Sequence, residues 1–144
     1  MAETVRGKRS FVAATVVLFL FAAAHSLAVV QDNFRETAPE DLPVRQALEG
    51  RQIPLGPFTM TGWGALQTLN SSYTVFLLYV AVLDLLLLGP AIRAGQLRAL
   101  ACVNAAFCAV LGGITLIFEI PPPMVFAFAA TALFVVSAVR HTRP

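Results

Sequence analysis

Charged residues are scarce in this chain of 144 residues. Only 12% of the residues are Asp, Glu, Lys or Arg, whereas 58% are hydrophobic. Soluble domains average about 25% charged residues and about 45–50% apolar residues. The composition therefore excludes an ordinary soluble domain. The basic residues form no patch interleaved with aromatic side chains, so we expect no nucleic-acid partner.

Cysteine and histidine are rare too, with two residues of each. Cys102 and Cys108 lie in one apolar run, and on a helix their spacing places them about 120° apart around the axis. We therefore expect no disulfide, and both thiols should be buried as small apolar groups. His25 and His141 are remote from each other in the chain, so we expect no haem or other cofactor and no metal site.

The chain does contain long apolar runs. Each is close to the length of about 20 residues that a helix needs to cross the hydrocarbon core of a membrane. The runs show no alternation of polar and apolar residues, which favours helices over barrel strands. The predicted spans cover residues 10–30, 65–89, 97–118 and 122–139.

These spans predict an all-α fold, a four-transmembrane-helix bundle that forms a single integral membrane domain over residues 1–144. The second and third connections are tight turns, one over residues 91–96 and one over the three prolines at 121–123. Because short connections join antiparallel neighbours, the order should be up-down-up-down. Only the first connection, the loop over residues 31–62, is long.

The basic residues are concentrated in alternate connections: both tails and the second connection are rich in them. Seven of the ten Lys and Arg residues occupy the N-terminal tail, the second connection and the C-terminal tail. Lys and Arg near spans are retained on the cytoplasmic side. We therefore expect an integral membrane protein with both termini cytoplasmic. The seven residues are Arg6, Lys8, Arg9, Arg93, Arg98, Arg140 and Arg143.

The first span also resembles a cleavable signal peptide. Basic residues precede the apolar stretch, and the small-x-small site Ser26-Leu27-Ala28 would permit cleavage. The apolar stretch continues through Val30, which makes it long enough to cross a membrane. We therefore expect this segment to be retained as the first helix. Cleavage would leave the orientation of the other three helices unchanged.

A short helix is predicted in the outer loop. Pro39, Glu40 and Asp41 followed by Pro43 indicate a helix start, with acidic residues in the first turn where they complement the helix dipole. The helix should end at Gly50 and lie on the outer surface with an apolar side toward the membrane. It would either cover the mouth of the bundle or act as a functional lid.

The chain then returns to the membrane. Prolines and a glycine break it over residues 53–57. Trp63 follows where an aromatic residue is expected, at the outer membrane–water boundary. The second helix should begin near Thr61 and end at Gly89-Pro90.

Polar residues of three helices are predicted to meet in the outer leaflet. On the second helix they recur at the spacing of one helical stripe, which extends to Thr74. Ionisable residues inside spans are costly and mark either a function or a buried partner. The candidate ligand-binding residues are His25, Gln67, Asn70, Ser71, Tyr73 and Glu119.

This outer cluster has two interpretations. In the first it is a polar pocket, open to the outer face, that binds a ligand or a lipid headgroup or handles a proton. In the second, His25, Gln67 and Asn70 join the helices through hydrogen bonds, and Glu119 faces the headgroups. The sequence leaves both interpretations open.

Asp84 lies in the inner half of the second helix, away from the outer cluster. Arg93 and Arg98 follow in the next turn, and long basic side chains can extend along apolar surface toward a buried acid. We therefore predict a structural ion pair between Asp84 and these arginines, which would fix the register of the helix; Lys8 or Arg9 could serve instead.

Small residues are frequent in the last two spans. Helices in lipid associate through close packing of small surfaces rather than through the hydrophobic effect. We expect packing faces at Ala22–Ala24 in the first span and, in the last two, at Ala105, Ala106, Gly112, Gly113, Ala127, Ala129 and Ala130.

A series of residues joins the first two spans: His25, Phe34, Pro39, Asp41, Thr61, Trp63, Asn70 and Ser72. Over residues 20–85 this series resembles an uncharacterised family of small bacterial four-helix integral membrane proteins. The resemblance implies the fold, a location in the bacterial cytoplasmic (inner) membrane, and an interest in His25 and Asn70. It implies no reaction. The chain departs from the family pattern in the spacing after Phe34 and at Tyr73, where members often carry another histidine.

The expected function is that of a small polytopic membrane protein that serves as a binding or accessory component. Its partners would be the lipid bilayer, a membrane protein or a second copy of the chain, and a lipid or small-molecule ligand. The alternative is a small membrane enzyme or proton-coupled carrier that uses His25 and Glu119. A channel formed by oligomerisation is disfavoured because no span carries a polar face along its whole length.

Overall fold

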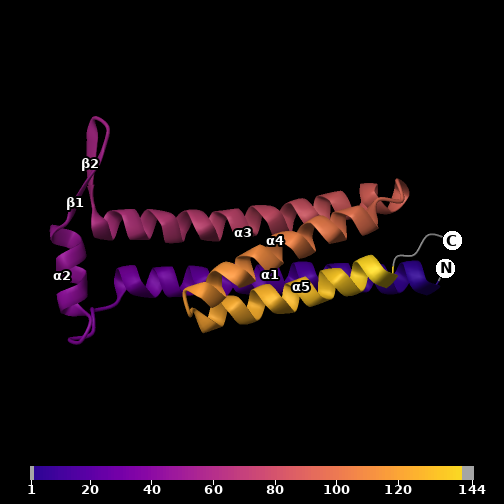
Figure 1. Ribbon diagram of the computed structural model, residues 1–144, viewed down its shortest axis with the longest axis horizontal. Coiled ribbons are helices and arrows are strands. Elements are labelled where there is room, and N and C mark those ends of the chain that lie inside the picture. The colour runs from indigo at the N-terminus through magenta and orange to yellow at the C-terminus, as the bar shows by residue number, and fades with distance from the viewer. Residues whose placement is uncertain (1, 141–144) are drawn as a thin grey trace. The chain divides into compact units, whose positions relative to one another are not determined.

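This computed structural model describes residues 2–140, and of residues 2–6 it describes the backbone. Within these residues the chain forms five α-helices and one two-stranded β-hairpin, in the order shown in Figure 1. Predictions that concern His141 and Arg143 lie outside the described residues, as does the side chain of Arg6.

Four helices of the described chain are long and apolar enough to cross a membrane. The predicted helical spans are therefore confirmed as helices, and the mostly helical, all-α fold is confirmed with them. The first helix extends well beyond its predicted bounds. These helices are α1 (Ala2–Phe34), α3 (Gly62–Arg93), α4 (Leu97–Ile117) and α5 (Pro121–Arg140).

The chain divides into two compact units. The bundle unit contains Met1–Phe21 and Leu77–Pro144, and the hairpin unit contains Ala22–Phe76. The bundle unit thus holds parts of α1 and α3 together with α4 and α5. The hairpin unit holds the rest of α1 and α3 together with the short elements between them.

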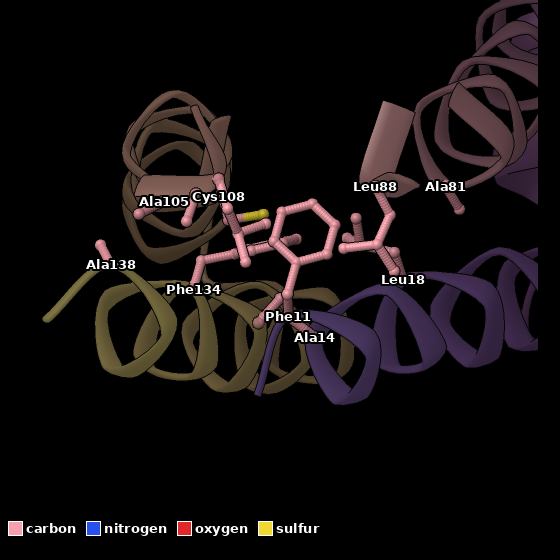
Figure 2. Close-up of a cluster of buried hydrophobic side chains, with 12 residues drawn as sticks. Phe11, Ala14, Leu18, Ala81, Leu88, Ala105, Cys108, Phe134 and Ala138 are labelled. Carbon is pink, nitrogen blue, oxygen red and sulfur yellow. The ribbon is translucent and has the colours of Figure 1, made fainter. Parts of the chain in front are cut away.

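A cluster of buried hydrophobic side chains forms the core of the bundle unit, where α1, α3, α4 and α5 point side chains toward one another (Figure 2). Phe11 and Phe134 meet edge to face, with ring centroids 5.2 Å apart, an arrangement that aromatic pairs favour. Phe21 stacks on Phe126 with centroids 5.3 Å apart. Cys108 is buried in this core, whereas Cys102 is exposed, so the predicted burial of both thiols is wrong for Cys102.

The contact between α4 and α5 depends on small residues. A Cβ atom added to Gly112 would lie 2.9 Å from the Phe128 ring, so this glycine permits a close approach. The predicted packing residues divide into two groups, because only one side of each helix faces the core. Ala105, Gly112, Ala127 and Ala130 are buried, whereas Ala106, Gly113 and Ala129 are not.

The end of α3 differs from the prediction. The helix continues through Gly89 and Pro90 to Arg93, so the predicted stop at Gly89-Pro90 is wrong. A proline removes one backbone donor but keeps its carbonyl, and the Pro90 carbonyl accepts a hydrogen bond from the Ala94 N–H at 2.9 Å. The helix ends at Arg93, and Gly95 in the turn that follows has a φ of +66°, which glycine readily adopts.

The turn between α4 and α5 also differs. The three prolines at 121–123 form the first turn of α5 and not the connection itself, since a helix start leaves its first N–H groups without partners and tolerates proline. The turn closes with a hydrogen bond from the Ile120 N–H to the Thr115 carbonyl at 2.9 Å. Glu119 stands within it at a φ of 54°, a left-handed conformation usually taken by glycine.

In the hairpin unit, α2 (Leu42–Gly50) confirms the predicted short helix in the outer loop. Its acidic neighbours are placed differently from the prediction, because Glu40 and Asp41 precede the first turn. Asp41 is the N-cap residue and its side chain makes no capping hydrogen bond.

A β-hairpin follows α2 and was not predicted. Strands β1 (Gln52–Leu55) and β2 (Phe58–Thr61) pair antiparallel, and the two-residue turn between them begins at Gly56 with a φ of +62°. Pro54 pairs with Thr59 inside the hairpin. Prolines argue against strands in general, but both strands of an isolated hairpin are edge strands, where proline is tolerated.

The start of α3 lies against the end of α2. The Gly62 N–H donates to the Arg51 carbonyl at 2.8 Å, and a Cβ atom at Gly62 would come within 2.9 Å of the Leu48 carbonyl oxygen. The Thr61 hydroxyl oxygen accepts a hydrogen bond from the Gly64 N–H at 3.0 Å and thereby caps the helix. The predicted helix start near Thr61 is confirmed.

Candidate functional site

Five of the six predicted ligand-binding residues belong to the hairpin unit. His25 on α1 is half-buried, and its Nε2 lies 3.2 Å from the backbone carbonyl oxygen of Asn70 on α3. Because a carbonyl only accepts, the histidine nitrogen is the donor in this bond. The His25 ring also meets the Tyr73 ring edge-on, with centroids 5.1 Å apart.

Gln67 makes the second polar contact between α1 and α3 in this unit. Its side-chain oxygen accepts a hydrogen bond from Asn33 Nδ2 at 2.9 Å, and the same Asn33 nitrogen donates to the Val29 carbonyl at 2.8 Å. The Gln67 amide nitrogen is buried without a partner among the described residues. Leaving a buried donor unpaired costs free energy, so this nitrogen has capacity for a further acceptor.

The remaining predicted residues contribute differently. Asn70 offers its backbone carbonyl, which also accepts from the Thr74 hydroxyl at 3.3 Å. Ser71 is exposed on α3. Glu119 belongs to the bundle unit and is exposed at the end of α4. The structure therefore brings His25, Asn70 and Tyr73 together, and Gln67 contacts Asn33 instead.

The sequence did not predict the best-defined polar arrangement, which lies between α2 and the start of α3. Arg45 donates through Nε to the Glu49 carboxylate at 2.8 Å and through Nη1 to the Thr37 hydroxyl at 2.6 Å. Its guanidinium carbon lies 4.9 Å from the centre of the Trp63 ring, within cation–π range. The four-residue spacing of Arg45 and Glu49 on a predicted helix was the available signal for part of this arrangement.

A cavity of about 400 Å³ opens beside this group. It is within the size range of about 300–1,000 Å³ that is typical of small-molecule sites. The end of α1, the loop before α2, α2 itself and the start of α3 all contribute to its wall. Apolar side chains such as Leu48 and Leu66 line part of it. Its charged and aromatic lining residues are Asp32, Arg35, Glu36, Asp41, Arg45 and Trp63.

Among the described residues of the bundle unit, the buried acidic residue is Asp84, which is 3% exposed. Its Oδ1 accepts a hydrogen bond from Asn104 Nδ2 at 2.6 Å, and its Oδ2 has no hydrogen-bond partner among the described residues. In the described part of the chain, Asp84 forms no ion pair with Arg93 or Arg98, so that prediction is wrong. The salt bridge among the described residues is the one between Arg45 and Glu49. Both arginines are exposed at the α3–α4 turn, while Asp84 points from the buried side of α3.

No protein-family model, no curated protein and no solved structure matches this chain. The resemblance to a family of small four-helix membrane proteins stays a prediction. The residues described here contain no group of three or more His, Cys, Asp and Glu side chains arranged to hold a metal ion.

Proposed function

We propose that this chain is a small integral membrane protein that binds a ligand at its outer end and serves as a binding or accessory component of the membrane. Four helices of membrane-crossing length support the integral location. The alternation of basic residues supports an orientation with both termini in the cytoplasm of a bacterium. In that orientation the loop that contains α2 is on the outer side.

The cavity beside α2 is the observation that carries this proposal. It combines ligand-sized volume, an apolar lining and charged groups, the combination typical of small-molecule sites. Arg45 is held from three directions before any ligand arrives, and a preorganised group loses little conformational entropy on binding. Under this proposal α2 is a cover over a site, which corresponds to the lid interpretation.

The polar contacts deeper in the hairpin unit support the same site by holding its helices. His25 bonds to α3 and Asn33 bonds to Gln67, so the ends of α1 and α3 that line the cavity are joined by two polar contacts. The unpartnered Gln67 nitrogen is a further donor near the outer end of α3. We therefore assign His25 and Gln67 to the support of the site.

The alternative function, an enzyme or proton-coupled carrier, needs His25 and Glu119 in one site. The two residues belong to different units, so neither unit by itself holds both groups. The binding function is therefore the better supported of the two.

Purification in a mild non-ionic detergent, followed by native mass spectrometry, tests the proposal. We expect a lipid or small molecule to be retained at about one copy per chain and to be lost largely in Arg35→Gln, a change at an exposed lining residue. Arg51→Gln is the matched control, because Arg51 is equally exposed and does not line the cavity. A protein that retains no ligand, or that retains the ligand equally in both variants, would remove the support for binding at this cavity.

A further inference from the structure

We propose that the cavity beside α2 holds a zwitterion, namely the headgroup of a membrane phospholipid that carries both a phosphate and a primary ammonium group. This inference rests on the proposed function, that the cavity binds a ligand, and it adds the chemistry of that ligand. The juxtaposition that carries it is two arginines and three carboxylates that line one cavity without pairing with each other.

The two arginines that line the cavity have unused donors. A guanidinium group has five N–H donors, and two of those of Arg45 are used by Glu49 and Thr37. Arg35 is exposed on the same cavity, and its side chain has no hydrogen-bond or ion-pair partner in the described part of the chain. Arginine donors match the oxygens of a phosphate group well. Two guanidinium groups are therefore available to a phosphate: that of Arg45, which is held by its contacts, and that of Arg35, which is not.

The three carboxylates that line the cavity form no salt bridge with the described basic residues. Asp32, Glu36 and Asp41 line the cavity, and among the described residues none of their carboxylates lies within 4.0 Å of a basic nitrogen, the distance at which a salt bridge forms. Opposite charges that share a cavity without neutralising each other can be bridged by a ligand that carries both signs. A primary ammonium group supplies three donors for carboxylate oxygens.

Other ligand classes fit these residues less well. The cavity has three acids and two arginines, so an anion alone would meet a net negative lining. A metal ion would need a cluster of ligating side chains, and the residues that the structure describes contain none. A quaternary ammonium group is recognised by aromatic faces, but Trp63 already carries Arg45 against its ring. A primary ammonium that forms hydrogen bonds is the cation that the carboxylates favour.

The membrane itself is the source that we infer. The cavity is built on the ends of α1 and α3, two helices of membrane-crossing length. Trp63 lines it at the start of α3, and tryptophan is enriched at the level of the lipid headgroups. Leu48 and Leu66 supply apolar surface in the same lining, as a lipid with its acyl chains attached would require.

Trp63 provides the measurement, because it is the single tryptophan of the chain and lines the cavity. Its fluorescence is recorded for the purified full chain in non-ionic detergent during titration with phosphatidylethanolamine, phosphatidylcholine and phosphatidylglycerol of equal acyl length, and with soluble phosphoethanolamine. We expect a saturable change with phosphatidylethanolamine. The other two lipids should bind about tenfold more weakly, since each lacks the donors of a primary ammonium. Soluble phosphoethanolamine should bind more weakly still, because it lacks acyl chains.

Paired variants separate the two halves of the site. Glu36→Gln should weaken phosphatidylethanolamine binding about tenfold and leave phosphatidylglycerol binding unchanged, because it removes a partner of the ammonium only. Arg35→Gln should weaken the binding of both lipids. Glu40→Gln and Arg51→Gln are the matched controls, since both residues are exposed and neither lines the cavity.

The outcomes distinguish this inference from the proposed function. Phosphatidylglycerol binding as tight as phosphatidylethanolamine binding, or a Glu36→Gln variant that binds both lipids normally, overturns the zwitterion while a ligand site remains. Phosphoethanolamine binding as tight as the lipid overturns the membrane source. If no titrant changes the Trp63 signal and no ligand survives purification, the proposed function fails together with this inference.

Discussion

His25 contacts α3 through a backbone carbonyl, so the side chain at position 70 does not take part in the bond. His25→Phe keeps an aromatic ring against Tyr73 and removes the donor. We expect it to lower the free energy of unfolding by about 1 kcal/mol, which is typical of one hydrogen bond between helices in a membrane. Asn70→Ala keeps the carbonyl and should change stability by less than about 0.5 kcal/mol. Thermal denaturation in detergent, followed by circular dichroism, measures both.

An Asn70→Ala variant as unstable as His25→Phe would contradict this account, because it would assign the stabilising contact to the Asn70 side chain. Loss of ligand retention in Asn70→Ala with stability unchanged would instead place that side chain in the binding site. Comparing the two variants therefore shows whether the outer polar cluster joins the helices or binds a ligand.

Asp84 and Asn104 depend on each other, because Asn104 supplies the hydrogen bond to a buried carboxyl group. Asn104→Ala leaves that group without a partner, and we expect the free energy of unfolding to fall by about 3 kcal/mol. The double variant Asp84→Leu with Asn104→Leu removes both polar groups and should be more stable than Asn104→Ala alone. Thermal denaturation in detergent compares the two. A double variant less stable than the single one would show that the polar pair itself is a net source of stability.

At the scale of the elements, the junction of α2, the hairpin and α3 requires glycine at position 62. A methyl group there would lie 2.9 Å from the Leu48 carbonyl oxygen, a backbone atom that cannot move independently. We expect Gly62→Ala to destabilise the junction by about 1–3 kcal/mol. Limited proteolysis of the loop between α1 and α3 measures the effect as faster cleavage.

Gly50→Ala is the matched control for this prediction. Gly50 is the last residue of α2, and an added Cβ atom there would have no atom within 4 Å. Alanine is favoured over glycine in helices by about 1 kcal/mol, so cleavage should be unchanged or slower. Equal acceleration in both variants would show that the α2–α3 contact does not hold the junction.

At the scale of the whole molecule, the distribution of basic residues predicts which side of the membrane each loop faces. We expect Glu40→Cys, placed in a background with Cys102 and Cys108 replaced by serine and alanine, to react with a membrane-impermeant maleimide added to intact cells. Gln96→Cys in the turn between α3 and α4 should react only after lysis. Labelling followed by mass shift on a gel reads out both. The reverse pattern would invert the orientation and place the α2 cavity on the cytoplasmic side.

Much of the helical architecture was predictable because its signals are local. A run of about 20 apolar residues identifies a span wherever it occurs, and Thr61 marks a helix start through its own side chain. The errors arose where local signals are ambiguous. Pro90 resembles a helix stop, yet a proline in a last turn removes a single hydrogen bond. Pro54 argues against a strand, yet an isolated hairpin has only edge strands.

The candidate site was predicted only in part. His25 and Gln67 were singled out because polar groups in apolar spans are rare, and both make contacts between helices of the hairpin unit. The cavity with Arg45 and Trp63 was missed, because neither residue is unusual where it stands: an arginine on an exposed helix and a tryptophan at a span end. Their importance comes from a contact across eighteen positions of the chain.

Residue composition within short windows was enough to predict the four helices that are long and apolar enough to cross a membrane, and it also predicts the sides of the loops. The partners of the polar residues depend on how the helices pack, which local patterns do not show. Asp84 bonds to Asn104 and not to an arginine, and Arg45 lies on Trp63. The four long helices are apolar around most of their circumference, and the polar stripe on α3 ends at Thr74, so no polar pattern around Asp84 or Asn104 indicates how these helices are rotated there. The rotation follows from close packing, and the rotation decides which polar groups meet.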